Sequence, residues 1–221
     1  MNETDNVIDR VRRALGRSGA PHTPPAPPAI DEPVVRLVHS DIGLPQLFAT
    51  RAAEMKMGVT FVEPDEAAAS VAWFLQERKC RKIALPGSRL LDDLWIRDTL
   101  RREGFELSRW DDPAMTLDAL YDGYDCAVTD VQYAVAESGT LVIKPSPLHG
   151  RGLSLVPMYH VAIVEPRQFL PDMVDLFETL AKEPDRSNWI LISGPSKTAD
   201  IEMNVVTGVH GPNVVQVFVL K

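Results

Sequence analysis

Short apolar segments alternate with amphipathic segments along most of the chain. Apolar residues spaced three and four positions apart predict helices over residues 44–57, 65–78, 91–102 and 171–181, with one or two helical turns over 113–120. Continuous apolar runs predict buried strands over residues 58–62, 82–85, 105–110, 126–129, 141–143, 161–164, 189–193 and 214–220. This alternation predicts an α/β fold with a mainly parallel sheet flanked by helices. The section from 126 to 164 lacks long helices, so we expect it to be antiparallel or rich in strands.

The N-terminal part of the chain has a different pattern. Helical spacing of apolar residues predicts a helix over residues 5–15, which Gly16 and Gly19 end. Six prolines between residues 21 and 33 predict an extended linker, because proline lacks the N–H that helices and central strands need. We therefore expect an N-terminal helix over 1–17, a proline-rich linker over 18–33 and an α/β domain over 34–221. The helix is either a mobile appendage or an arm that packs on a neighbour.

Composition and charge exclude several classes of function. The 221 residues are 45% hydrophobic and 24% charged, which suits a globular domain and excludes a mostly disordered chain. The formal net charge of −8 argues against binding nucleic acid or anionic membranes over the whole surface. A local basic pocket for one small anion is compatible with that charge. The chain has neither an apolar run of about 18 residues nor a secretion signal, so we expect a cytoplasmic protein without a membrane span.

The two cysteines, Cys80 and Cys126, are too few for an iron–sulfur cluster with four cysteine ligands, and neither belongs to a CxxC pair. We expect two buried free thiols, with a disulfide between them as the alternative. The sequence also lacks metal-ligand spacing of the HExxH type, a GxSxG nucleophile elbow, a GxGxxG fingerprint and a Walker A loop. We therefore expect no metal or cofactor bound by this chain.

Candidate chemistry begins after the strand predicted over 126–129, because ligands of open α/β sheets bind beyond the carboxyl ends of the strands. Glu137 is placed there to act as a base, a nucleophile or a hydrogen-bond acceptor. Gly139 and Thr140 would allow a substrate to approach the backbone closely. Alternatively, Asp130 caps a turn, Glu137 is solvated and Gly139 makes a tight turn.

A second candidate lies between two glycines. Arg151 follows Gly150 and precedes Gly152, so its guanidinium is a candidate clamp for a carboxylate or phosphate. The alternative is an ordinary surface loop. His160 opens the next predicted strand, and we expect it to be structural.

Two further stretches complete the candidate set. Ser193, Gly194, Ser196, Lys197 and Thr198 follow a predicted strand and precede a predicted helix, whose backbone donors together with Lys197 would hold an anion. The alternative is that Ser196 or Thr198 only caps the helix. His210 lies between two glycines before the last strand and is a candidate proton donor, unless the segment is only a tight turn.

At these stretches the sequence resembles the LUD-domain family, and within it proteins of the lactate-utilisation protein C type. The resemblance is carried by YAVAESGTL at 133–141, RGLSLVPMYH at 151–160, ISGPSKTADIE at 192–202 and GVHGP at 208–212. It covers roughly residues 34–221. It implies a fold like that of the ribose-5-phosphate isomerase, glucosamine-6-phosphate deaminase and coenzyme A-transferase group. The loop of Glu137 is similar to the active-site glutamate region of coenzyme A-transferases.

The resemblance implies a role in oxidising lactate to pyruvate together with partner subunits, of which at least one carries iron–sulfur clusters. With two cysteines, this chain would be the component without clusters, binding a small organic anion or the partners. A second hypothesis is a stand-alone enzyme acting on a small anionic metabolite, with Glu137 as base or nucleophile. A third is a binding module without chemistry.

Overall fold

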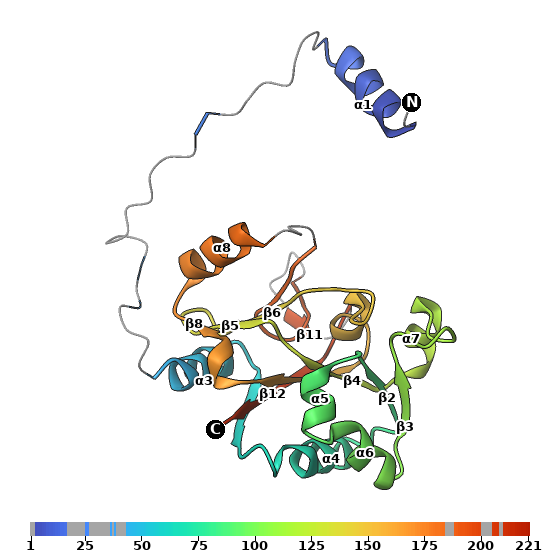
Figure 1. Cartoon of the computed structure of the whole chain (residues 1–221), viewed down its shortest axis with the longest axis vertical. Coiled ribbons are helices and arrows are strands. Elements are labelled where there is room, and N and C mark those ends of the chain that lie inside the picture. Colours follow the sequence, from blue (N-terminus) through green and yellow to red (C-terminus); the bar gives the residue numbers. More distant parts are fainter. Residues whose placement is uncertain are drawn as a thin grey trace. The chain divides into compact units, whose positions relative to one another are not determined.

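The computed structural model describes residues 3–16, 25–26, 36, 38, 43–183, 188–199, 205–207 and 210–221. The chain divides into one unit over Met1–Glu32 and a second over Pro33–Lys221. In the first unit, α1 (Glu3–Ala14) forms where helical spacing predicts a helix (Figure 1). The predicted linker over 18–33 lies outside the described residues, apart from residues 25–26.

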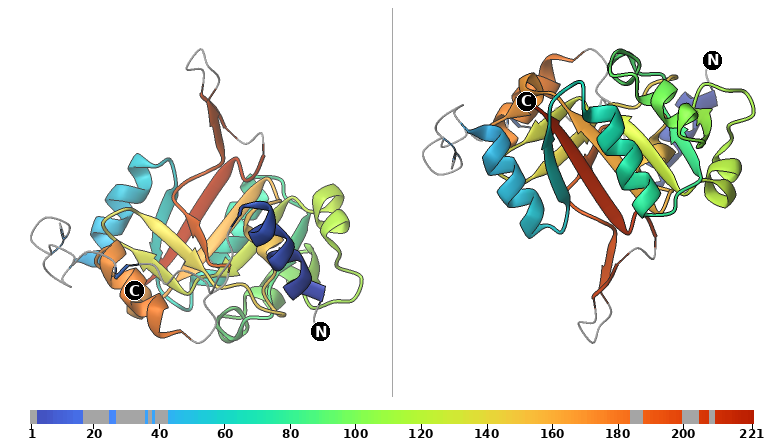
Figure 2. Two further views of the ribbon diagram at one scale, coloured as in Figure 1. Left: turned by 90° about the horizontal axis from the view of Figure 1, so that it is seen from above. Right: turned by 90° about the horizontal axis from the view of Figure 1, so that it is seen from below.

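The second unit is built on a six-stranded sheet in which every pair of neighbouring strands is parallel. The strand order across the sheet is β1 (Gly58–Val62), β12 (Val214–Leu220), β7 (Tyr159–Val164), β4 (Cys126–Asp130), β2 (Lys82–Leu85) and β3 (Glu106–Arg109). Figure 2 shows β12, in red, between β1 and β7. The predicted α/β fold with a mainly parallel sheet is confirmed.

One face of this sheet is covered by α4 (Ala67–Glu77), α5 (Arg89–Asp93) and α6 (Ile96–Arg102), which lie together below it in Figure 1. Val71 and Leu75 of α4 are fully buried in the core of this face. Phe74 contacts Phe218 of β12 edge to face, with ring centroids 6.3 Å apart. Burial of each such side chain stabilises the fold by about 1.5–3 kcal/mol, so this layer fixes the sheet in place.

The other face is covered by a four-stranded sheet and by α3 (Leu44–Glu54). The strand order of this smaller sheet is β8 (Phe169–Leu170), β5 (Tyr133–Val135), β6 (Thr140–Ile143) and β9 (Ile190–Ile192), with antiparallel pairing of β6 to both neighbours. Leu141 and Ile143 pack with Val217 of β12 in one core. On its other side, α8 (Met173–Lys182) buries Leu176 against Val135 and Val142. The prediction of a strand-rich middle section is confirmed.

The helix predicted over 91–102 is wrong as one element, because the chain forms α5 and α6 instead. Trp95 between them takes a left-handed conformation with φ 56°, which interrupts the regular helical backbone. The Trp95 N–H donates to the carbonyl of Asp92 at 3.0 Å, a tight turn that ends α5. The turns predicted over 113–120 form α7 (Leu117–Gly123), which starts later because Thr116 caps it through a 3.0 Å bond from the Ala119 N–H.

The helix predicted after Ser193 is also wrong. The chain instead forms β10 (Lys197–Ala199), which pairs in antiparallel fashion with β11 (Val205–Thr207). Valine and threonine favour strands, and this preference agrees with the observed pairing. Residues 197–199 are therefore strand, and the described residues after Ser193 contain no helix N-terminus to bind the predicted anion.

The order of the strands creates a switch point between β2 and β4. From β2 the chain moves outward to β3, then returns past β2 to β4 and continues to β7 and β12 on the other side. The carboxyl ends of β2 and β4 therefore lie at the position where open α/β sheets bind their ligands.

Candidate functional site

Two of the predicted stretches meet in a chain of hydroxyl groups. Thr140 Oγ1 lies 2.7 Å from Ser138 Oγ and 2.7 Å from Ser193 Oγ, which joins the β5–β6 turn to the end of β9. Thr140 is almost fully buried, whereas Ser193 is exposed. The hydroxyls satisfy one another, so this contact holds the smaller sheet together at the turn.

Gly139 and Gly194 bring these loops against the end of α3. Gly139 has φ 63°, and a Cβ there would lie 2.5 Å from the Ala52 amide nitrogen. Gly194 has φ 120°, and a Cβ there would lie 2.6 Å from the Met55 carbonyl oxygen. Both positions require glycine because of the backbone conformation and the close approach. The backbone of α3 therefore occupies the space beside Gly139 through which a ligand was predicted to approach.

Lys197 also points to the end of α3. Its Nζ lies 3.5 Å from the Met55 carbonyl oxygen, just past the last helical residue. A helix C-terminus carries partial negative charge, which attracts a cation and repels an anion. The position of Lys197 is thus explained by helix stabilisation. Thr198 lies in β10, and its side chain is outside the described residues.

Glu137 and Arg151 lie in different places. Glu137 is half-buried in the β5–β6 turn, where its N–H donates to the Pro171 carbonyl at 3.0 Å. Arg151 starts the short helix η1 (Arg151–Ser154), and its Nη1 donates to Asn188 Oδ1 at 3.3 Å. Because Asn188 precedes β9 and Ser193 follows it, Arg151 lies at the opposite end of β9 from the hydroxyl chain.

His210 lines a pocket at the amino ends of β4, β7 and β12, on the edge of the large sheet opposite the switch point. The pocket has a volume of about 280 Å³. Ser196 lies nearby, since its N–H donates to the Pro212 carbonyl at 2.9 Å. The lining residues are Tyr121, Tyr124, Asp125, Leu155, Val156, Met158, Tyr159, His210, Gly211 and Asn213. The predicted residues are therefore divided among several locations.

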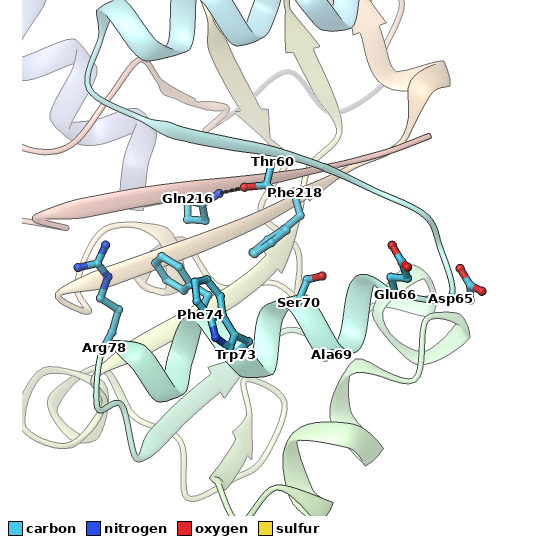
Figure 3. Close-up of a pocket in the computed structure, with 10 residues that line it drawn as sticks. All are labelled: Thr60, Asp65, Glu66, Ala69, Ser70, Trp73, Phe74, Arg78, Gln216 and Phe218. Atoms are coloured by element: carbon cyan, nitrogen blue, oxygen red, sulfur yellow. Dashed lines mark hydrogen bonds between the residues drawn. The ribbon is translucent and has the colours of Figure 1, made fainter.

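A larger groove of about 710 Å³ lies between α4 and strands β1 and β12 (Figure 3). Its middle is formed by Trp73, Phe74 and Phe218, and Gln216 donates to Thr60 Oγ1 at 3.0 Å on the strand side. Acidic Asp65 and Glu66 lie at one end, and Arg78 lies at the other (Figure 3). None of the predicted site residues lines this groove.

The sequence reasoning missed a polar cluster at the switch point. Thr129 Oγ1 at the end of β4 lies 3.0 Å from His160 Nε2 on β7, and both residues are fully buried. His149, from the loop after β6, places its Nδ1 3.6 Å from Asp130 Oδ1. Sequence reasoning treated His160 as structural and Asp130 as a cap. An acidic residue directly after a buried strand was the signal that could have located the cluster.

The two cysteines are free and buried, as expected. Burial raises the pKa of Cys80 to about 11, and Asp125 acts in the same direction. Burial raises the pKa of Cys126 well above its ordinary value, and Cys80 adds to this effect. Both side chains are therefore unreactive thiols at neutral pH. Within the described part of the chain, no three histidine, cysteine or acidic residues are grouped so that they could hold a metal ion.

The chain belongs to the α/β class, with a six-stranded parallel sheet and a smaller second sheet on one of its faces. A crystal structure of a DUF162 family protein from Deinococcus radiodurans has this fold, with a TM-score of 0.64, 24% identity, and coverage of 83% of this chain and 99% of that chain. The model of the LUD domain family matches residues 45–220. The chain therefore belongs to the LUD-domain family, and the resemblance seen in its sequence is confirmed.

Relatives within the family include several named lactate utilization protein C. The protein of that name from Halalkalibacterium halodurans is 29% identical over 220 residues, covering 96% of this chain and 92% of the relative. For the one from Bacillus pumilus, 36% identity extends over 122 residues, or 52% of this chain and 51% of the relative. The uncharacterized protein YkgG of Escherichia coli is 32% identical over 154 residues, 66% of each chain.

No helix in the described residues is long and apolar enough to span a membrane.

Proposed function

We propose that this chain is the component without iron–sulfur clusters of a system that converts L-lactate to pyruvate. The observation that carries the proposal is the match over 96% of this chain to a protein named lactate utilization protein C. Oxidation of lactate releases two electrons, which iron–sulfur partner subunits would accept. Two buried free thiols cannot ligate such a cluster, so the partners would hold it. These reduced thiols fit a cytoplasmic protein.

Deletion of the gene tests this role. We expect growth on L-lactate to be lost in a strain without a second lactate dehydrogenase, and to return when the full chain is expressed from a plasmid. Growth on pyruvate should be unchanged and is the control. Undiminished growth of the deletion strain on L-lactate would refute the proposal.

We further propose that the small organic anion binds in the pocket that His210 lines. The tyrosine hydroxyls and the Asn213 amide supply hydrogen-bond donors there, and lactate is small enough for about 280 Å³. The carboxylate of Asp125 is held by the N–H groups of Arg81 and Lys82, at 2.7 and 3.0 Å. By contrast, Lys197 contacts a carbonyl at the end of α3, and Arg151 contacts Asn188 at the opposite end of β9 from Ser193. Neither cation belongs to this pocket.

Isothermal titration calorimetry with sodium lactate and sodium pyruvate tests this location. We expect His210→Ala and Asn213→Ala each to weaken binding by roughly ten- to 150-fold, since a lost hydrogen bond to a charged group costs roughly 1.5–3 kcal/mol. Lys197→Ala is the matched control and should bind normally. The reverse result, with loss in Lys197→Ala alone, would place the anion at the loop after β9.

Co-purification tests the partners. The full chain, expressed with a cleavable tag in its own host during growth on lactate, should retain subunits whose brown colour and iron content report clusters. Iron and sulfide should leave with the partners when these are removed by salt. Recovery of the chain without any iron-containing subunit would count against this part of the proposal.

A further inference from the structure

The polar cluster at the switch point is built from two neighbouring strands and one loop. Thr129 and Asp130 end β4, and His160 lies on the adjacent strand β7. The loop after β6 brings His149 over the end of β4, where it approaches Asp130. The cluster lies beside the carboxyl ends of β2 and β4, the position at which open parallel sheets bind their ligands.

Three atoms of this cluster are buried and have no hydrogen-bond partner in the described structure: Asp130 Oδ1, His149 Nε2 and His160 Nδ1. Buried polar atoms are nearly always paired, because leaving one unpaired costs about 1–3 kcal/mol. Three such atoms in one cluster therefore indicate a site for the polar group of a ligand. The side chains of His149 and Asp130 are 12% and 29% exposed, so the cluster is more open to solvent at Asp130 than at His149.

The loop that carries His149 is firmly held. The backbones of Ser146 and His149 bond to each other in both directions, at 2.9 and 3.0 Å. The N–H of Gly87, just after β2, donates to the Leu148 carbonyl at 2.8 Å. A Cβ on Gly150 would collide with the indole of Trp110, so the loop lies directly on that ring. The imidazole of His149 is thus positioned by rigid elements, as a preorganised site requires.

Both imidazoles are neutral at pH 7. Burial lowers the pKa of His149, and the charge of Asp130 acts in the opposite direction. Burial lowers the pKa of His160 to about 3, and the nearby His149 contributes to this lowering. A neutral imidazole whose Nδ1–H faces a carboxylate has a free lone pair on Nε2, which can accept a proton.

We propose that His149 and Asp130 form an acid–base pair that binds the hydroxyl group of a small hydroxy compound at the carboxyl ends of β2 and β4. The hydroxyl donates to His149 Nε2, and Asp130 holds the imidazole through Nδ1. The present separation of 3.6 Å is slightly longer than a hydrogen bond, and such pairs tighten when a ligand binds. The proposal goes beyond the lactate-system role, because it names a second site on the opposite edge of the sheet from His210.

The charges of the cluster select the ligand class. The Asp130 carboxylate repels the carboxylate of a hydroxy acid, so that group would lie away from Asp130, whereas the hydroxyl would be accepted at His149 Nε2. An ammonium group would lose its hydration in a largely buried site, which costs several kcal/mol. When the hydroxyl proton moves to Nε2, the O–H bond breaks, an N–H bond forms, and the imidazolium is stabilised by Asp130. Return of the proton reverses the step, so no other reactant is needed.

Nuclear magnetic resonance of the full chain labelled with ¹⁵N in its histidine rings tests the proposal. The chain has five histidines, and His149→Gln assigns the relevant signal by its loss. Sodium lactate and sodium pyruvate carry the same charge but differ in hydroxyl against keto oxygen. We expect lactate to shift the Nε2 resonance of His149 in a saturable manner, and pyruvate to leave it unchanged. Asp130→Asn should weaken this response at least about tenfold.

Asp111→Asn is the matched control. It removes an acidic residue near the end of the neighbouring strand β3, where Asp111 pairs with Arg109 at 2.8 Å, and the response of His149 should persist. An unshifted His149 at high lactate, an equal shift with pyruvate, or full affinity in Asp130→Asn would overturn the proposal. If Asp130→Asn fails to fold, the contrast between lactate and pyruvate on the unmodified chain decides. In His210→Ala the response should persist, so failure of the His210 pocket and failure of this site are distinguishable.

Discussion

Thr129 and His160 are joined by a 3.0 Å hydrogen bond between Oγ1 and Nε2, with both residues fully buried between strands β4 and β7. Because burial lowers the pKa of His160 to about 3, the folded protein keeps this imidazole neutral where the unfolded chain takes up a proton. The unfolded state therefore binds more protons between about pH 6.5 and pH 3, and stability falls as the pH decreases through that range.

Urea unfolding at several pH values measures this dependence. We expect His160 to contribute a loss of about 1.4 kcal/mol per pH unit below pH 6. His160→Gln should flatten the slope, whereas Thr129→Val should lower stability at every pH and keep the slope. Equal slopes in the wild-type chain and His160→Gln would show that this histidine is not the cause.

Gly139 should tolerate substitution less well than another glycine of similar conformation. Gly139→Ala combines a left-handed backbone with a Cβ that lies 2.5 Å from the amide nitrogen of Ala52. Gly104 has φ 86° and open space around its Cβ position, so Gly104→Ala isolates the cost of conformation. We expect a loss of about 1–2 kcal/mol for Gly104→Ala and a further 1–3 kcal/mol for Gly139→Ala. Thermal and denaturant unfolding of the two variants make the comparison.

Thr140 is the central member of the hydroxyl chain, and its removal should cost more than removal of an outer member. Thr140→Val keeps the shape but leaves the hydroxyls of Ser138 and Ser193 without their shared partner, so we expect a loss of about 1–2 kcal/mol. Ser193 is exposed and water can replace it, so Ser193→Ala should cost less. Chemical denaturation ranks the variants, and equal losses would contradict a chain centred on Thr140.

Asp172 combines two roles that substitution can separate. Its Oδ1 accepts from the N–H of Asp175 at 2.9 Å and caps α8, while its Oδ2 lies 3.6 Å from Arg36 Nη1. Asp172→Ala removes both interactions, and we expect it to lower stability by about 1–3 kcal/mol. Asp172→Asn keeps the cap and should recover about 1 kcal/mol of that loss. Hydrogen exchange of the α8 amides should be faster in the alanine variant than in the asparagine variant.

The fold was largely predictable because its core strands are apolar and short. The runs at 58–62, 82–85 and 214–220 became β1, β2 and β12 with the predicted bounds. Shorter elements were missed, since β5 and β8 contain three and two residues and their pairing depends on partners distant in sequence. The region after Ser193 shows the same limit, because pairing between β10 and β11 replaced the predicted helix.

The site was harder to predict because sequence shows which residues follow strands but not which sheet a strand joins. Ser193 follows β9 of the smaller sheet, while His210 precedes β12 of the larger one, so the two do not share an edge. Thr140 and Ser193 do meet, 53 positions apart in the chain. His149 was overlooked in favour of its neighbour Arg151, since only its contact with Asp130 distinguishes it.

The place of β12 has a consequence for biosynthesis. This strand is made after every other strand of the large sheet, yet it is inserted between β1 and β7 and pairs with both. While the ribosome still holds residues 214–220 in its exit tunnel, β1 has no neighbour and the edge of β7 that pairs with β12 is open. Until residues 214–220 have left the tunnel, the nascent chain exposes unpaired strand edges, which favour aggregation and are protected by chaperones that bind chains during translation.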